Sequence, residues 1–354
     1  MRYLFWTILT AVVAVRYVVT TPHYEDGQKL RITTRVSSEP VKYDDAQYFK
    51  VAGLKVYLPL YPEVGYGDKI IVEGEVKEGK LVKPVLNKVT ESDNYLYKLR
   101  SRLVLFYQKS LPEPHASLIA GVTIGSKASI PKDFWQKLKL SGTAHVVVAS
   151  GMNVTLVAGF LLSMLVIVLP RKRAIPFALG GIWLYAVLSG FDAPIIRAAI
   201  MGSVALTAQE LGRVNIAWRA LLISALLMLI IWPQWLTDLG FILSFTATAS
   251  LIAFEKKVAK LLKKVPFMLK EDLSTTLAAQ IGVAPILYFS FGQFNVLSPL
   301  INALVLWTIV PVTVIGMVGG IVGQLFEPLG RIIVYLVYPL TLWFVMIVNL
   351  MSNF

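Results

Sequence analysis

The polar residues of this sequence that could do chemistry lie mostly inside long apolar runs. Ser150 and Gly151 interrupt one such run, and a glycine beside a serine weakens a helix and exposes backbone groups that hydrocarbon cannot satisfy. Such a break is tolerated where protein or water surrounds it, as at a pore or a substrate site. The remaining candidates fall at the depth of the expected membrane segments, and they are His145, Asn153, Arg197, Asp238 and Gln280.

Each of these side chains has a structural explanation beside a functional one. Charged groups at membrane depth are costly, and they are usually paired or face water. Asp238 stands where a helix begins and suits a capping role, whereas Arg197 needs an anion, which Asp238 or a phosphate could supply. His145 either bonds to the broken segment or is a satisfied structural histidine. Asn153 and Gln280 either join helices or line a path, and both explanations remain open.

Several classes of site are excluded by composition. The chain has no cysteine and only three histidines, which lie far apart, so the sequence predicts no metal site and no thiol nucleophile. It also contains no G-x-x-x-x-G-K-[ST] segment, so we expect no nucleotide-driven motor. These absences predict a protein that is not an enzyme and holds no cofactor. The net charge of +13 suits a partner made of phosphates, although membrane proteins are often basic for reasons of topology.

The apolar runs predict a polytopic α-helical membrane protein, since 56% of the 354 residues are hydrophobic. Residues 1–20 are expected to form an uncleaved membrane anchor helix. From residue 145 onward we expect eight membrane segments, near 145–169, 174–190, 194–212, 215–231, 236–254, 273–290, 295–325 and 330–352. The segment 295–325 could be one bent helix or two segments that are broken at Pro311.

The connections between these segments predict an orientation. Cations gather at residues 171–173, at Arg213 and between residues 256 and 270, and these three connections alternate with others that lack cations. Since positively charged connections stay in the cytoplasm, the chain before residue 145 is expected outside. The C-terminus is then expected outside as well.

Residues 21–92 differ in pattern from the rest of the chain, because short runs of alternating apolar and polar residues are separated by turn residues. About five short strands in about sixty residues suit a small all-β domain, an OB-like barrel, which the topology makes extracytoplasmic. Between residues 25 and 91, eleven basic residues match eleven acidic ones, so the domain is neutral. Its aromatic side chains could stack nucleic-acid bases or could form the core, and they are Tyr43, Tyr48, Phe49, Tyr57, Tyr61 and Tyr66.

Residues 93–144 are basic, with eight cations against three acids. Apolar residues recur at spacings of three and four between Tyr95 and Ser110, so we expect an amphipathic helix that lies on the membrane surface. The basic residues either meet lipid phosphates or form a collar around the mouth of a path for a polyanion. The collar candidates are Lys98, Arg102, Lys127, Lys132, Lys137 and Lys139.

Four blocks of sequence together resemble one family. The first runs L-x-x-G-x-x-x-G from Leu118, continues through Pro131 and ends as S-G-x-x-H-x-x-x-x-S-G at Gly151. The others are Arg197-Ala198-x-x-Met201, Asp238-x-Gly240-Phe241-x-Leu243-Ser244, and Asn302-Ala303 followed by Pro311. In this order they resemble the membrane domain of the ComEC-type competence proteins.

The resemblance implies an inner-membrane channel that carries single-stranded transforming DNA inward. It also implies an extracytoplasmic DNA receptor and a cytoplasmic ATP-dependent helicase as partners. Many family members continue into a metallo-β-lactamase-like domain, which we expect this chain to lack, so that any nuclease would be a separate protein. The rival hypotheses are a secondary solute transporter and a membrane scaffold that binds a partner through its β-domain. The expected domains are residues 1–20 (anchor), 21–92 (OB-like domain), 93–144 (basic connector) and 145–354 (channel domain).

Overall fold

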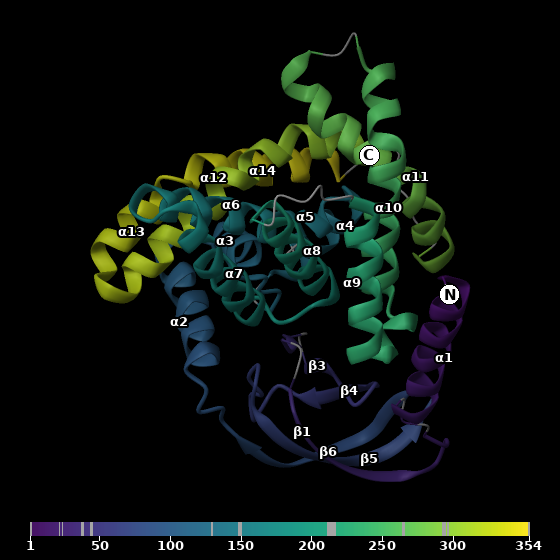
Figure 1. Ribbon diagram of the computed structural model, residues 1–354. Helices are drawn as coiled ribbons and strands as arrows, with labels where there is room; N and C mark the ends of the chain where they lie inside the picture. Colours follow the sequence, from purple (N-terminus) through teal and green to yellow (C-terminus); the bar gives the residue numbers. More distant parts are fainter. Residues whose placement is uncertain are drawn as a thin grey trace.

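The computed structural model describes residues 2–20, 22, 24–36, 39–42, 45–128, 130–147, 151–210, 217–263, 266–291, 295 and 297–352. An N-terminal helix leads into a sheet, and the remaining described chain is helical. Figure 1 shows the sheet at one end of the molecule and the helices gathered above it.

The sheet has six strands in the order β1-β5-β6-β4-β3-β2, and all neighbours are antiparallel except β4 and β6. Among the described residues β1 pairs only with β5, and the two-residue β2 pairs only with β3, so the two edges do not meet. The closed OB-like barrel expected from the sequence is therefore corrected to an open, curled sheet. The strands are β1 (Lys29–Arg35), β2 (Val41–Lys42), β3 (Ala46–Val51), β4 (Leu54–Pro59), β5 (Lys69–Lys77) and β6 (Lys80–Thr90).

The sheet curls because one of its faces is apolar. In β4, Leu54, Val56 and Leu58 are buried while Lys55 and Tyr57 are exposed, as the two-residue period of a half-buried strand requires. The inward side chains of β3, β4, β5 and β6 form one core beneath the sheet. Phe49 belongs to this core, so this aromatic residue packs and is not available to stack on a base.

The helical part begins after residue 94, and α1 precedes the sheet. The helices before α8 are α1 (Arg2–Thr20), α2 (Tyr95–Ser110), α3 (His115–Ile124), α4 (Lys132–Leu140), α5 (Ala144–Val147), α6 (Gly151–Val168) and α7 (Arg171–Leu188). The rest are α8 (Ala193–Glu210), α9 (Ala217–Ile231), η1 (Pro233–Thr237), α10 (Leu239–Leu261), α11 (Phe267–Phe291), α12 (Ser298–Leu325), α13 (Glu327–Tyr335) and α14 (Tyr338–Met351).

Four stretches of the described chain are long and apolar enough to cross a membrane: Ala144–Val168, Leu239–Leu261, Lys270–Ser290 and Ser298–Leu325. A fifth is possible if α13 and α14, which meet at a bend of 47°, form one broken span. Helices occupy all eight segments expected from the sequence, but the number that crosses a membrane stays a prediction. The segment around Pro311 is one continuous helix, because α12 passes through this proline without ending.

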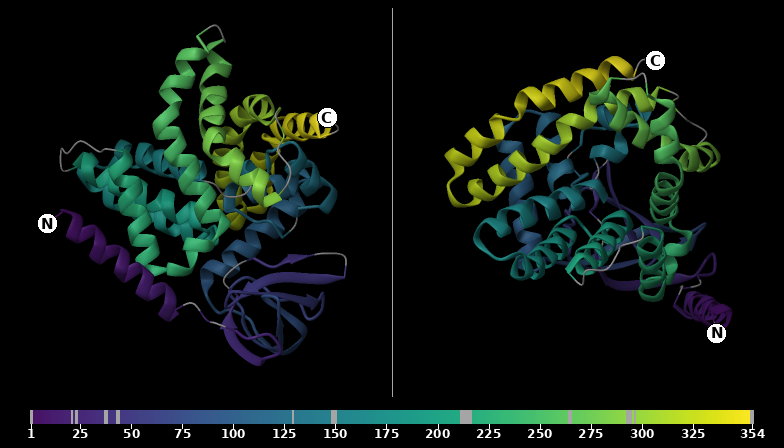
Figure 2. Two further views of the ribbon diagram at one scale, coloured as in Figure 1. Left: turned by 90° about the vertical axis from the view of Figure 1, so that its right-hand side faces the viewer. Right: turned by 45° about the horizontal axis from the view of Figure 1, so that its top comes forward.

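The helix α2 does not have a free apolar face. Leu103, Phe106 and Tyr107 are buried, and α2 contacts α3, α7, α12 and α13. Protein therefore covers the face that the sequence analysis assigned to a lipid surface, and α2 is an integral part of the helical domain. The helices α10 and α11 pair as a hairpin that projects from the end of the molecule opposite the sheet (Figures 1 and 2).

Candidate functional site

Arg197 lies near the start of α8, which contacts α6, α7, α9 and α10. Its Nε donates a hydrogen bond of 2.8 Å to Ser244 Oγ on α10, and its Nη1 lies 3.7 Å from the sulfur of Met201. Two of the family-like blocks thus meet at this guanidinium.

Gly151, the first residue of α6, brings a third block to the same place. A Cβ at Gly151 would lie 2.6 Å from Arg197 Nη2 and 3.3 Å from the Cβ of Ala198. The missing side chain therefore makes the room that the guanidinium occupies. Ser150, the other half of the expected break, lies outside the described residues.

No carboxylate neutralises Arg197 within the part of the chain that the structure describes. Asp238, the candidate partner, instead caps α10, since its Oδ1 accepts a hydrogen bond of 3.1 Å from the backbone N–H of Phe241. The capping alternative for Asp238 is thus the one observed. A guanidinium that keeps unused donors among apolar helices is suited to bind an anion such as a phosphate.

The other candidates from the sequence do not join this cluster. Gln280 donates a hydrogen bond of 2.8 Å to Ser298 Oγ and so connects α11 to the start of α12. Buried Asn153 donates to the carbonyl of Val122 at 2.8 Å and so connects α6 to α3. His145 is exposed on α5. The structure therefore assigns helix–helix contacts to Asn153 and Gln280.

A second contact that involves a family-like block joins the turn after α4 to α12. Gly142 has a positive φ of 73°, and a Cβ there would lie 2.6 Å from Ser298 Oγ. Ser298 thus contacts both Gln280 and Gly142, and the sequence analysis missed it. Nothing in the local sequence pattern marks a serine that stands between a loop and an apolar helix as a contact residue.

At least three of the six collar candidates are ion-paired, so the six do not form one group of unpaired cations. Lys98 pairs with Asp93 at 3.3 Å, and Lys137 pairs with Asp133 at 2.8 Å, one turn away on α4. Arg102, Lys132 and Lys139 are exposed, on α2 and α4. The remaining candidate, Lys127, bonds to Asp192 at 3.1 Å across two loops of the helical domain.

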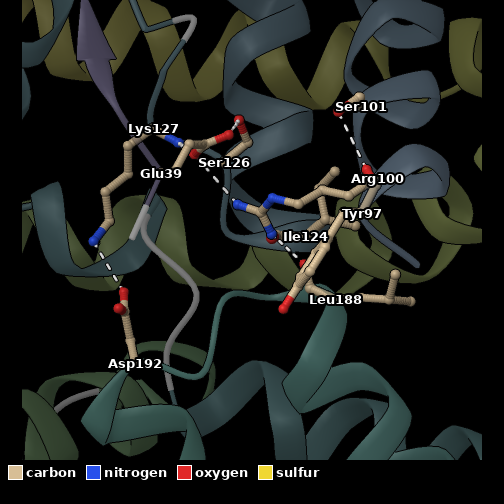
Figure 3. A network of polar contacts seen from close by, with 9 residues as sticks. All are labelled: Glu39, Tyr97, Arg100, Ser101, Ile124, Ser126, Lys127, Leu188 and Asp192. Atoms are coloured by element: carbon tan, nitrogen blue, oxygen red, sulfur yellow. Dashed lines mark hydrogen bonds and ion pairs between the residues drawn. The ribbon is translucent and has the colours of Figure 1, made fainter. Parts of the chain in front are cut away.

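The polar network at the junction of the sheet and the helices (Figure 3) was not expected from the sequence. The carboxylate of Glu39, which follows β1, accepts hydrogen bonds from Ser126 Oγ at 2.8 Å and from the backbone N–H of Lys127 at 2.6 Å. The same carboxylate lies 3.3 Å from Nη2 of Arg100, and the side chain of Arg100 is only 4% exposed. A carboxylate with three donors ties the β-domain to the helical domain.

Arg100 also caps the C-terminal ends of two helices. Its Nη1 donates to the carbonyls of Ile124 and Leu188, the last residues of α3 and α7 (Figure 3). Helix ends leave carbonyls without partners and carry partial negative charge, so a cation there is stabilising. Sequence spacing could not reveal this role, because the two helix ends lie 24 and 88 residues from Arg100.

Two tyrosines complete the junction. Arg100 lies over the ring of Tyr66 at 5.3 Å from its centroid, and Tyr66 meets Tyr97 edge-on at 4.8 Å. Burial, with a smaller contribution from Tyr97, raises the pKa of Tyr66 to about 12, so its hydroxyl stays protonated at neutral pH. This aromatic candidate is therefore a packing residue of the junction.

The part of the chain that the structure describes contains no group of three or more histidine, aspartate or glutamate side chains that could hold a metal ion. What the described polar residues offer is a half-buried cation without an acidic partner at Arg197, and a paired network at the domain junction.

Comparisons with known proteins agree with the four blocks. The profile of a family described as "Competence protein" matches residues 122–354. The ComE operon protein 3 of Bacillus subtilis (strain 168) is 28% identical over 228 residues, which cover 62% of this chain and 28% of that protein. The competence protein ComA of Neisseria gonorrhoeae is 26% identical over 220 residues, which cover 57% of this chain and 30% of that protein. The chain thus spans less than a third of the length of these curated relatives. No solved structure matches the chain significantly.

Proposed function

Because the chain belongs to the Competence protein family, we propose that it is a channel of the cytoplasmic membrane that conducts single-stranded DNA inward during natural transformation. The observation that carries this proposal is Arg197, whose guanidinium has no acidic partner among the described residues and lies where α8 contacts both α6 and α10. One strand suits this place better than a duplex, because a single guanidinium between contacting helices can meet one phosphate at a time.

The proposed orientation puts the sheet outside the cell. Its support is the lysine-rich end of α10, which lies at the end of the molecule opposite the sheet (Figure 1). Cations that flank membrane segments favour the cytoplasmic side. An outer sheet would receive DNA from an extracytoplasmic receptor.

The proposal includes external partners for movement and cleavage. The sequence has no P-loop, so a cytoplasmic ATP-dependent helicase would supply the work, and a separate nuclease would degrade the other strand. The chain itself would neither hydrolyse ATP nor cut DNA. A solute transporter or a scaffold would instead leave transformation intact when Arg197 is changed.

The test is transformation frequency in cells that carry Arg197→Gln, measured beside surface DNA binding and the amount of protein in the membrane. A charge-assisted hydrogen bond contributes about 1.5–3 kcal/mol, so we expect uptake to fall roughly ten- to a hundredfold with unchanged surface binding. Arg197→Lys keeps the charge and should reduce uptake less.

The matched control is Arg331→Gln on α13, which removes an exposed arginine whose partner, Glu327, lies one turn away. This variant should transform normally. Normal uptake by Arg197→Gln at a normal protein level would rule out the proposed role of the guanidinium.

A further inference from the structure

Four lysines lie in one row across the exposed face of the β-domain. Lys50 on β3 is the register partner of Lys55 on β4. Lys55 is in turn the partner of Lys80 on β6, and Lys80 is the partner of Lys77 on β5. Register partners project from the same face of a sheet, and all four side chains are exposed. With neighbouring strands roughly 4.8 Å apart, the row spans roughly 14 Å.

The row has no structural explanation. Like charges directly opposite each other destabilise a pair of strands, and this sheet contains three such pairs in succession. None of the four lysines has an ion-pair partner among the described residues. The nearest acids in the register are Glu75, two residues before Lys77 on β5, and Glu78 in the turn that follows, and neither pairs with the row.

An aromatic pair lies in the next row on the same face. Tyr48 and Tyr57 are register partners two residues away from Lys50 and Lys55, and their ring centroids are 4.9 Å apart. Tyr57 is 44% exposed. Phe49 thus belongs to the core, Tyr66 to the domain junction, and Tyr48 and Tyr57 to this outer face, whereas Tyr43 lies outside the described residues.

We infer that this face, the lysine row with its tyrosine pair, binds a single strand of nucleic acid. Lysines that follow a phosphate backbone beside aromatic rings that stack on bases are the two elements of sequence-tolerant single-strand binding. A lipid surface would also use lysines and tyrosines, and the experiment below separates the two ligands. β3 and β4 lie between the rest of the sheet and the helices (Figure 1), so their outward face is turned toward the helical domain.

The inference rests on the proposed function for its biological meaning, because the face would hold the strand before it reaches Arg197. Its physical basis is separate, since the row lies outside residues 122–354, which the family profile matches.

The experiment measures binding of a fluorescent oligothymidylate to the full-length protein in nanodiscs of neutral lipid, at several salt concentrations. The variant changes Lys50, Lys55, Lys77 and Lys80 to Gln. The control changes four other exposed strand lysines to Gln and removes the same charge, and these are Lys29, Lys42, Lys69 and Lys88.

We expect the row variant to bind more weakly, and its plot of log K against log salt to be shallower by about 0.7 for each phosphate that a lysine no longer neutralises. Its thermal unfolding midpoint should be unchanged or raised, because repulsion within the sheet is removed. The control should keep most of the affinity and of the salt dependence. Tyr57→Ala should weaken binding roughly five- to a hundredfold with little change in salt slope.

Equal affinity and slope in the row variant and the control would overturn the inference, and so would a wild-type protein that does not bind the oligonucleotide. Row-dependent binding of phosphatidylglycerol vesicles without oligonucleotide binding would identify a lipid surface instead. These outcomes are independent of the Arg197 test. Failed transport with intact, row-dependent binding contradicts only the channel. Arg197-dependent transport together with binding that does not depend on the lysine row contradicts only the binding face.

Discussion

At the scale of single residues, the space around Gly151 decides what the family-like motif can do. The sequence alone suggests that alanine is harmless at this position, since it adds one methyl group and favours a helix. The structure contradicts that expectation, because the added Cβ would lie 2.6 Å from Arg197 Nη2. The guanidinium is the flexible end of a long side chain, so it can move without unfolding the protein.

We therefore predict that Gly151→Ala lowers transformation while the protein level in the membrane stays normal. The displaced guanidinium would no longer donate its hydrogen bond to Ser244. The matched control is Gly159→Ala on the same helix, where a Cβ meets nothing within 4 Å. Transformation frequency and membrane-resident protein are measured for both. Equal, normal uptake in the two variants would show that the position of Arg197 does not matter.

At the scale of elements, glycines on α12 allow α2 to approach closely. A Cβ at Gly320 would overlap the hydroxyl of Tyr107, and one at Gly323 would overlap the ring of Phe106. The hydroxyl of Tyr107 donates a hydrogen bond of 3.0 Å to the carbonyl of Gly316. The close approach joins the basic connector to a helix that follows it by some 200 residues in the chain.

The corresponding prediction is a decrease of stability in Gly320→Ala. Overpacking of this kind costs about 1–3 kcal/mol, which should appear as a lower unfolding midpoint of the detergent-purified protein. Gly180→Ala on α7 is the control, because nothing lies within 4 Å of its added Cβ. Its better helix propensity should hold or raise the midpoint. If the unfolding midpoint of Gly320→Ala is equal to or higher than that of the control, the packing of α2 against α12 is not tight.

At the scale of the whole molecule, the buried ion pair of Glu39 and Arg100 connects the β-domain to the helical domain. Removing one partner of a buried ion pair leaves an uncompensated charge and costs about 3–5 kcal/mol. Exposed pairs contribute about 0–1 kcal/mol, and Arg31 with Glu73 is such a pair on the sheet, with side chains 67% and 42% exposed.

Glu39→Ala should thus release the β-domain, whereas Glu73→Ala should not. Limited proteolysis between the domains and the unfolding midpoint both report this release. Glu39→Gln should give an intermediate result, because its single amide oxygen can still accept from the backbone N–H of Lys127, whereas the amide NH2 replaces the oxygen that accepts from Ser126. Indistinguishable proteolysis of Glu39→Ala and Glu73→Ala would mean that the network does not hold the domains together.

The sequence by itself determined the local features of this protein. The two-residue and near-four-residue periods of apolar residues predicted the strands and the helices, because burial of one face follows from those periods. The start of α10 at Asp238 was also predictable, since an N-cap depends on residues that are close in sequence. The four family-like blocks could be identified for the same reason, because the residues of each block lie close together in the sequence.

The tertiary structure alone decided which distant residues meet. Gly151, Arg197 and Ser244 come together because α8 packs against both α6 and α10, and no spacing along the chain encodes that packing. The open sheet depends on where β1 and β2 find partners, and the role of Arg100 depends on two helix ends far from it in sequence. The lysine row exists only through strand register, since a shift of one residue would have turned Lys50 and Lys55 to the other face.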